Sequence, residues 1–345
     1  MTSARLISIV VPAMNEQENI LPFYEAVKAV TDSLPDFQWE LLFVDDGSTD
    51  STTERILALM ETDPGVRVLR LSRNFGSYAA IKAGFDNARG DACISISADL
   101  QDPPELFRAF TEKWLEGYHI VWGVREQRDD PWSKKVMANI FYRLVRRLAL
   151  ADLPEHGMDC GLFDRKVVDV FREIKDQNSI TFMTVYWMGF HQSQVPYHRQ
   201  ARQFGLSKWP VGKRVKSALD VITSFSYLPL RLSSYVGLLI SCIAFLGAMI
   251  ILFNKLVLNI GEWGWPSLMV TMLFLSGTQL LVIGILGEYL WRIGSEVRGR
   301  PQYIVMEEFG FDKQGRYRQP GVSANSMSSR EAAGIHSSVA TEVHK

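Results

Sequence analysis

The chain has 345 residues and a mass of 39.1 kDa, and its 37 lysines and arginines nearly balance 38 aspartates and glutamates, for a net charge of -1. This balance gives no reason to expect a general nucleic-acid binder, which would be strongly basic. The three cysteines, Cys93, Cys160 and Cys242, are scattered, so neither a disulfide framework nor a cysteine-based metal site is expected. Each is predicted to be a small buried apolar residue.

The apolar run 6–11 is too short for a signal peptide, because Pro12 ends it and five polar residues follow at 15–19. It is predicted to be the first buried strand. Further strands are expected at 40–44, 66–71, 92–97 and 119–123, and helices at 16–33, 51–62, 76–88 and 104–116. Strands that alternate with helices predict an α/β domain with a mostly parallel, Rossmann-like sheet. This domain is expected to span residues 1–208.

Polar side chains come directly after three of these strands: Asn15 and Glu16, then Asp45 and Asp46, then Asp99, Gln101 and Asp102. They are interpreted either as turns and helix caps, where such residues are common, or as a ligand site. Ligands of parallel sheets bind at this edge, and carboxylates gathered there need a cation or donors to offset their repulsion. The clusters therefore favour Mg²⁺ or Mn²⁺ with bound phosphates. Neither common glycine-rich phosphate motif is present, which argues against ATPase and dinucleotide chemistry.

Two long uncharged segments lie at 232–254 and 263–287. The first has 23 residues, and a helix of that length spans roughly 34 Å, enough to cross a hydrocarbon core about 30 Å thick. We therefore predict a two-helix transmembrane hairpin over 232–291, with helices at about 232–257 and 265–290.

The charges around this hairpin predict its orientation. Lys and Arg flank both outer ends, whereas the connection carries only Lys255 and Glu262. By the positive-inside rule, the N-terminal domain and the tail 292–345 face the cytoplasm, as expected of a multi-pass protein of the inner (cytoplasmic) membrane. Segment 209–231 is interpreted as an amphipathic juxtamembrane helix or a plain linker, and the tail is expected to be disordered after about residue 310.

Several segments resemble motifs of one enzyme family. These segments are 10–16, 44–50, 73–76, 98–104, 159–163, 205–209 and 225–231. Over roughly residues 5–305 the chain resembles family 2 glycosyltransferases of the GT-A fold. The Ser207-Lys208 element and the two spans resemble the polyprenyl-phosphate branch, which includes dolichol-phosphate mannose synthase and the bactoprenol glucosyltransferases.

The resemblance implies inverting transfer of one sugar from a nucleotide diphosphate sugar, expected to be UDP-glucose, to polyprenyl (undecaprenyl) phosphate. It assigns the donor nucleotide to Pro12, Asn15, Glu16, Asp45, Asp46 and Asp99. It assigns the divalent metal, Mg²⁺ or Mn²⁺, to Asp99 and Gln101. The family usually has Asp-x-Asp, whereas this chain has Ser97-Ala98-Asp99, and the neutral serine weakens the expected metal site unless Asp102 compensates.

Six cations and no acid occur between residues 199 and 216: Arg199, Arg202, Lys208, Lys213, Arg214 and Lys216. One interpretation is a basic juxtamembrane segment attracted to anionic lipids. The resemblance implies that Arg202, Ser207 and Lys208 bind the acceptor phosphate, with Arg125 also near a phosphate. Both interpretations are compatible, because the acceptor lies at the membrane surface.

Asp159 matches the position of a proposed catalytic base in related enzymes. A phosphate monoester has a second pKa of about 6, so its attacking oxygen is largely ionised at neutral pH without a base. Asp159 is therefore predicted to act either as a base or as a residue that orients the acceptor, and a turn aspartate before Gly161 is the third possibility.

Other functions stay open at this stage. The donor is alternatively UDP-N-acetylglucosamine, a modified UDP-arabinose or GDP-mannose. A processive polysaccharide synthase is disfavoured, because the Gln-x-x-Arg-Trp element is absent and two spans do not build a pore. Ser97 leaves open a catalytically weak scaffold for a lipid-sugar flippase. Family precedent also favours a homo-oligomer.

Overall fold

The computed structural model describes residues 4–126, 158–174, 176, 180–199, 228–253, 257 and 264–311. The strands are β1 (Arg5–Ala13), β2 (Phe37–Asp45), β3 (Val66–Leu71), β4 (Ala92–Ser95), β5 (Ile120–Arg125), β6 (Met158–Asp164), β7 (Gln192–Tyr197) and β8 (Val305–Phe309). The helices are α1 (Ile20–Asp32), α2 (Thr52–Met60), α3 (Ser77–Asn87), α4 (Leu106–Leu115), α6 (Arg165–Glu173), α7 (Thr181–Trp187), α9 (Leu228–Phe253) and α10 (Trp265–Val297).

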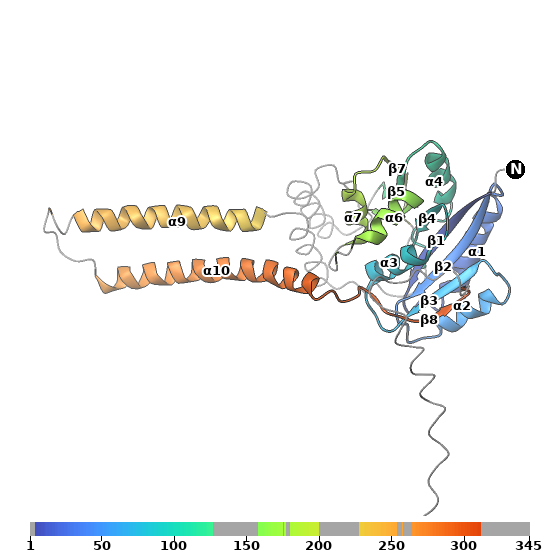
Figure 1. Cartoon of the computed structure of the whole chain (residues 1–345), viewed down its shortest axis with the longest axis horizontal. Helices are drawn as coiled ribbons and strands as arrows, with labels where there is room; N and C mark the ends of the chain where they lie inside the picture. Colours follow the sequence, from blue (N-terminus) through green and yellow to red (C-terminus); the bar gives the residue numbers. More distant parts are fainter. Residues whose placement is uncertain are drawn as a thin grey trace, which may run out of the picture. The chain divides into compact units, whose positions relative to one another are not determined.

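The eight strands form one sheet in the order β7-β5-β6-β4-β1-β2-β3-β8 (Figure 1). The four central strands β4, β1, β2 and β3 are parallel to one another, and β5 is parallel to β7. β6 is antiparallel to β4 and β5, and β8 is antiparallel to β3. The predicted α/β fold is thus confirmed, with a parallel centre in a mixed sheet.

The first five strands and first four helices lie where the sequence predicts them, to within a few residues. The sequence pattern does not predict β8, because residues 292–345 are expected to form a tail. Instead, the residues after α10 return to the sheet and add an edge strand beside β3. The α/β domain therefore includes residues far beyond the expected boundary at 208.

The two faces of β1 contact different helices because strand side chains alternate in direction. Ile7, Ile9 and Val11 belong to a buried core with apolar residues of α1, α2 and α4. Val10 points to the other face, where α3, α6 and α7 gather (Figure 1). There α3 approaches so closely that a Cβ on Gly84 would lie 2.1 Å from Val10 Cγ1, so only glycine fits.

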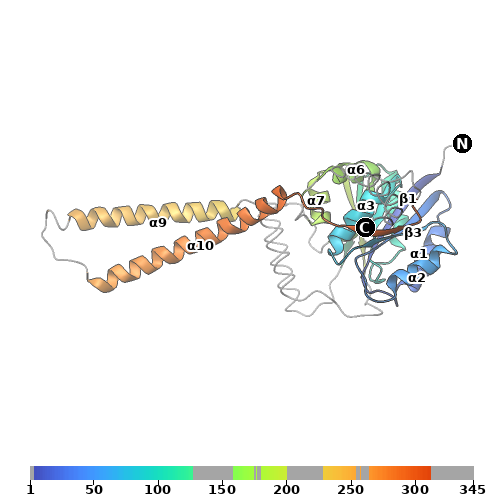
Figure 2. The ribbon, with the colours of Figure 1, turned by 60° about the horizontal axis from the view of Figure 1, so that its bottom comes forward.

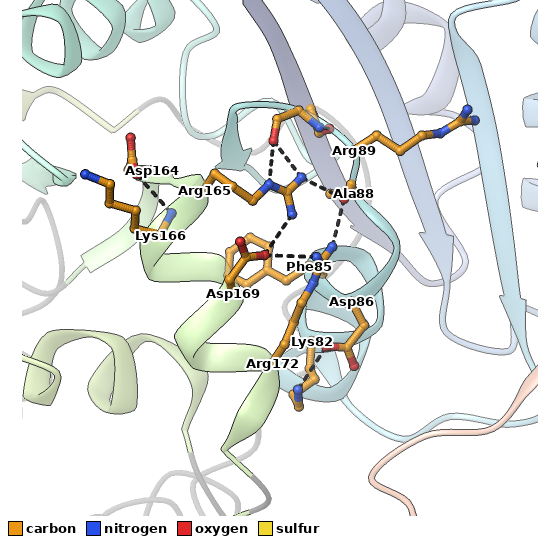
Figure 3. Close-up of polar contacts among 12 residues, drawn as sticks. Lys82, Phe85, Asp86, Ala88, Arg89, Asp164, Arg165, Lys166, Asp169 and Arg172 are labelled. Atoms are coloured by element: carbon orange, nitrogen blue, oxygen red, sulfur yellow. Dashed lines mark hydrogen bonds and ion pairs between the residues drawn. The ribbon is translucent and has the colours of Figure 1, made fainter. Parts of the chain in front are cut away.

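Two arginines of α6 cap the end of α3 (Figure 3). Arg172 donates to the carbonyl oxygens of Phe85 and Ala88 at 2.7–2.9 Å, and Arg165 donates to those of Ala88 and Gly90 at 2.6–2.9 Å. The last carbonyls of a helix lack partners within it and carry partial negative charge. The guanidinium groups therefore fix the position of α3 against α6.

Side-chain and backbone bonds fasten β8 and its flanking residues to the domain. Ser72 N donates to Ile304 O at 2.9 Å, Tyr303 Oη donates to Asp86 Oδ2 at 2.8 Å, and Arg67 Nε donates to Gly310 O at 3.2 Å. These bonds lie on both sides of the strand. The chain after the second long helix is thus tied to β3 and α3.

Helices α9 and α10 are long, apolar and in contact with each other (Figure 2). Windows of 18 residues in α9 and 30 residues in α10 are apolar enough to cross a membrane, and almost none of their side chains are buried within the protein. The helices run over 228–253 and 265–297, against the expected 232–257 and 265–290. Segment 209–227 and the tail from 312 onward lie outside the described residues.

The cysteines differ in their surroundings. Cys93 and Cys160 are fully buried as expected, and burial raises the pKa of the Cys93 thiol to about 12, which makes it unreactive. The expectation of burial is wrong for Cys242, which is exposed on α9. Contact with α10 buries few side chains of α9, so even a small residue such as Cys242 stays exposed.

Candidate functional site

The loops that follow β1 and β2 are hydrogen-bonded to each other at the carboxyl edge of the sheet. Asn15 N donates to Ser48 Oγ at 2.9 Å, and Thr49 N donates in return to Asn15 Oδ1 at 2.8 Å. Glu16 N donates to Thr52 Oγ1 at 2.9 Å. Asn15 has φ of 52°, a left-handed conformation that asparagine tolerates better than most residues. Predicted residues Asn15 and Glu16 therefore belong to a fixed loop pair, and half-buried Pro12 lies just before it in β1.

Asp45, the last residue of β2, is completely buried within this loop pair. Its Oδ1 accepts a hydrogen bond from Ser48 N at 2.8 Å, and its Oδ2 accepts one from the Thr53 hydroxyl. The Arg70 Nε atom lies 3.9 Å from the same oxygen. In this geometry Asp45 organises the turn and the start of α2.

Asp46 binds a different loop, the one between β3 and α3. Its two carboxylate oxygens accept hydrogen bonds from Phe75 N at 2.7 Å and Gly76 N at 2.8 Å. Burial raises the pKa of Asp46, and these two N–H groups partly offset that effect. Asp46 thus joins loop 72–76, whose Gly76 has φ of 100°, to the loop pair.

The acidic loop after β4 is held in a strained conformation. Leu100 has φ of 56°, a left-handed conformation that costs a leucine about 1–3 kcal/mol. Asp99 and Gln101 flank it, and Gln101 N donates to Asp99 Oδ1 at 3.3 Å. Strain of this kind persists where the surrounding structure enforces it, which is common at functional sites.

A β-bulge presents Asp159. In the pairing of β5 with β6, Gly123 lies opposite Cys160 and Val124 opposite Met158, so Asp159 is the extra, unpaired residue. Such bulges redirect a side chain out of the regular pleat. Asp159 forms an ion pair with Arg125 at the end of β5.

The end of β7 and the residues just after it add two more side chains to this group. The Tyr197 hydroxyl donates to Asp102 Oδ1, and Arg199 Nη2 donates to Gln101 Oε1 at 2.9 Å. Arg199 also lies near the carboxylates of Asp102 and Asp159. We call the set Gln101, Asp102, Arg125, Asp159, Tyr197 and Arg199 the ion-pair cluster. The sequence pattern gives no signal for Tyr197 and marks Arg199 only as one of six basic residues between 199 and 216.

Asp102 is the most enclosed acid of the ion-pair cluster, with 1% of its surface exposed. Burial raises the pKa of Asp102, while Arg199 and the Tyr197 hydroxyl act in the opposite direction. Its Oδ2 atom is buried and has no hydrogen-bond partner among the described residues. A buried carboxylate oxygen without a donor is costly unless a ligand completes it.

The oxygen donors after β4 fit a hard divalent cation. Asp99, Gln101 and the orphan oxygen of Asp102 are carboxylate and amide oxygens, the ligands that Mg²⁺ and Mn²⁺ prefer. Within the described part of the chain, no three His, Cys, Asp or Glu side chains converge as a complete metal site. A Mg²⁺ ion usually keeps several waters and takes only one or two carboxylates from the protein.

Asp46 and Asp99 both follow parallel strands that flank β1, namely β2 and β4, at the carboxyl edge of the sheet. The structure also brings Gln101, Arg125 and Asp159 together, although they are up to 58 residues apart in sequence. The predicted phosphate ligands Arg202, Ser207 and Lys208 lie outside the described residues.

Comparison with known proteins identifies the family of this fold and site. The model of glycosyl transferase family 2 matches residues 8–171. The uncharacterized glycosyltransferase YkcC of Bacillus subtilis is 43% identical over 92% of this chain and 98% of its own length. The chain belongs to glycosyl transferase family 2. It is a glycosyltransferase whose α/β domain has the GT-A type of fold, as the sequence motifs predicted.

Other relatives match this glycosyltransferase over nearly the whole chain. The bactoprenol glucosyl transferase of Shigella phage SfII is 40% identical over 87% of this chain and 97% of its own length. Among solved structures, glucosyl-3-phosphoglycerate synthase from Mycobacterium tuberculosis is 20% identical, covers 64% of this chain and 78% of its own, and has a TM-score of 0.44.

Proposed function

We propose that this glycosyltransferase transfers a single glucose from UDP-glucose to polyprenyl phosphate, with inversion, at the cytoplasmic face of the membrane. The observation that carries the proposal is the match to bactoprenol glucosyl transferases from phages SfII and SfV over 97–98% of their lengths, which includes the two apolar helices. A lipid acceptor requires an active site kept near the bilayer. Two membrane helices that lead into an edge strand of the catalytic sheet would supply that attachment.

On this proposal the loop pair and loop 72–76 hold the donor nucleotide. Pro12, Asn15 and Glu16 line the base and ribose, and Asp46 contacts the nucleoside beside the loop that it binds. Asp45 does not contact the donor on this proposal; it fixes the turn after β2 through Ser48 and Thr53. A rigid arrangement of this kind lowers the entropy that donor binding must overcome.

The acidic loop would carry the diphosphate. Asp99 and Gln101 would hold Mg²⁺ or Mn²⁺, with Asp102 in place of the acid that Ser97 lacks. The bound ion would neutralise negative charge on the departing nucleotide. Leu100 keeps Asp99 and Gln101 in their places before the donor arrives.

On the acceptor side, Arg125, with Arg202, Ser207 and Lys208, would bind the lipid phosphate. Arginine suits bidentate phosphate contacts, and lysine supplies a point charge. Asp159 is paired with Arg125, so we propose that it orients this guanidinium, and hence the acceptor, rather than serving as an indispensable base. The test is Asp159→Asn, assayed across pH 6 to 8. A turnover loss that is the same at every pH supports orientation, whereas a loss confined to the lower pH range, where the phosphate is singly charged, indicates a base.

The function itself is tested by product extraction. Membranes containing the protein are incubated with polyprenyl phosphate, Mg²⁺ or Mn²⁺ and one labelled nucleotide sugar from a panel of UDP-glucose, UDP-N-acetylglucosamine, a modified UDP-arabinose and GDP-mannose. We expect label in the organic phase from UDP-glucose alone. Transfer from another donor would mean that the proposed sugar is wrong. If folded protein transfers sugar from no donor, the alternative is favoured, namely a catalytically weak scaffold for a lipid-sugar flippase.

A further inference from the structure

Arg199 makes contacts that join the acidic loop to the acceptor side of the site. Its Nη2 atom donates to Gln101 Oε1 at 2.9 Å, its Nε atom lies 3.8 Å from Asp102 Oδ1, and its Nη1 atom lies 3.7 Å from Asp159 Oδ2. One guanidinium group therefore lies against two side chains that follow β4 and one side chain at the bulge of β6. About a quarter of the Arg199 side chain is exposed, so the side chain is partly buried at the surface of the domain.

The other charged groups around Arg199 leave it a specific role. Arg125 is already paired with Asp159, and the Tyr197 hydroxyl donates a hydrogen bond to Asp102 Oδ1. Asp99 adds a further negative charge near Asp102. Among the described residues, Arg199 is the cation that lies within 4 Å of an Asp102 carboxylate oxygen, and Arg125 adds a weaker positive influence on Asp102.

The Gln101–Asp102 end of the ion-pair cluster is where the proposed divalent ion would bind, so the ion and the Arg199 guanidinium would be close to each other. A Mg²⁺ ion lies about 2.1 Å from its oxygen ligands. If it shared Gln101 Oε1 with Arg199 Nη2, which is 2.9 Å from that oxygen, the ion and the nitrogen would be at most about 5 Å apart. Like charges at that distance, partly shielded from water, repel strongly.

We propose that Arg199 is a built-in counter-cation, which holds Gln101 and Asp102 until the divalent ion arrives with the donor and displaces it. This inference rests on the proposed function, because it takes the metal site at Asp99 and Gln101 as given. Arg199 would keep the acidic loop compact without donor, at the expense of weaker metal binding. Displacement leaves the guanidinium beside Asp159, on the acceptor side.

The test measures Mn²⁺ binding rather than turnover. Full-length protein in detergent is titrated with Mn²⁺ and the unbound ion is followed by electron paramagnetic resonance, with and without UDP. Arg199→Gln removes the charge, Arg199→Lys keeps it without the forked geometry, and Arg108→Gln on the exposed face of α4 is the control with the same change of charge.

We expect Arg199→Gln to bind Mn²⁺ about five- to tenfold more tightly than the wild type without UDP, Arg199→Lys to be intermediate, and Arg108→Gln to be unchanged. Should Arg199→Gln fail to fold, tighter Mn²⁺ binding by Arg199→Lys alone still supports the proposed exchange, in which the divalent ion displaces the Arg199 guanidinium. Unchanged or weaker binding by folded Arg199 variants overturns it.

Gln101→Ala separates this inference from the proposed metal site. If Gln101→Ala loses Mn²⁺ affinity while the Arg199 variants match the wild type, the metal site stands and the exchange is wrong. If no variant binds Mn²⁺ with or without UDP, both the metal site and the exchange are wrong.

Discussion

Asp46 illustrates how one buried carboxylate positions a loop through main-chain groups. The two N–H donors of Phe75 and Gly76 each require an acceptor oxygen, and a carboxylate supplies both. An asparagine supplies one oxygen and turns an NH₂ group toward the second N–H. The residue is therefore far more constrained than its place in a Ser- and Asp-rich turn suggests.

We predict that Asp46→Asn weakens UDP binding about ten- to a hundredfold, because a hydrogen bond to a charged group is worth about 1.5–3 kcal/mol. Burial raises the pKa of Asp46, so wild-type affinity should also fall as the pH drops, beginning at a higher pH than for an ordinary aspartate, because the carboxylate protonates. Calorimetric titration with UDP across pH measures both effects. The variant should lack this acidic fall, and the exposed Asp36→Asn should behave like the wild type.

A second buried charge, Glu40, holds the centre of the sheet together. It pairs with Arg67 and accepts hydrogen bonds from Ser8 Oγ at 2.5 Å and Arg89 N at 3.1 Å. Both Glu40 and Arg67 are more than nine-tenths buried. Removing one partner of such a pair strongly destabilises the fold, since the surviving charge stays buried without compensation.

Glu40→Ala should accordingly lower the free energy of unfolding by about 3–5 kcal/mol. Urea unfolding in detergent, followed by tryptophan fluorescence, measures the loss. Glu61→Ala, an exposed change, should cost less than about 0.5 kcal/mol. Equal stability of Glu40→Ala and the wild type would mean that the bonds of Glu40 make no net contribution to the free energy of unfolding.

Among the elements of the fold, β8 is an edge strand of the sheet that follows α9 and α10 in the sequence. It pairs with β3, and Arg70 Nη1 lies 3.1 Å from Glu307 Oε2 across the two strands. Loop 72–76 begins one residue after β3, and its first N–H donates to Ile304 O. The strand therefore supports the loop that Asp46 binds.

Removing the chain from residue 301 onward should release this edge without unfolding the domain. We expect amides of β3 and Ser72 to exchange with deuterium at least tenfold faster, while those of β1 and β2 stay protected, because local openings are cheaper than global unfolding. Hydrogen exchange with mass spectrometry resolves the segments. Undiminished protection of β3 would show that β8 adds no local stability.

For the whole molecule, the arrangement of charges predicts how the chain lies in the bilayer. Basic residues flank the hairpin at its outer ends, and the connection between α9 and α10 has only one lysine. The free-energy cost of moving Lys and Arg clusters across the membrane favours both termini in the cytoplasm.

Single-cysteine labelling tests this orientation after Cys93, Cys160 and Cys242 are replaced by serine or alanine. In intact spheroplasts, an impermeant maleimide should label Asn259→Cys in the connection between the helices. It should label Asp32→Cys, on the exposed side of α1, only after permeabilisation. The reverse pattern would invert the proposed topology.

The amino-acid sequence by itself determined the alternation of strands and helices, the two membrane-length segments and the polar clusters at 15–16, 45–46 and 99–102, because periodicity, length and turn chemistry are local properties. It did not separate Asp45 from Asp46, although one organises a turn and the other binds loop 72–76. Only the tertiary structure decided the place of β8, the bulge that presents Asp159, and the contacts of Tyr197 and Arg199 with Asp102 and Gln101. Those features depend on pairings between residues far apart in the chain, and no local pattern encodes which distant strand or side chain becomes the neighbour.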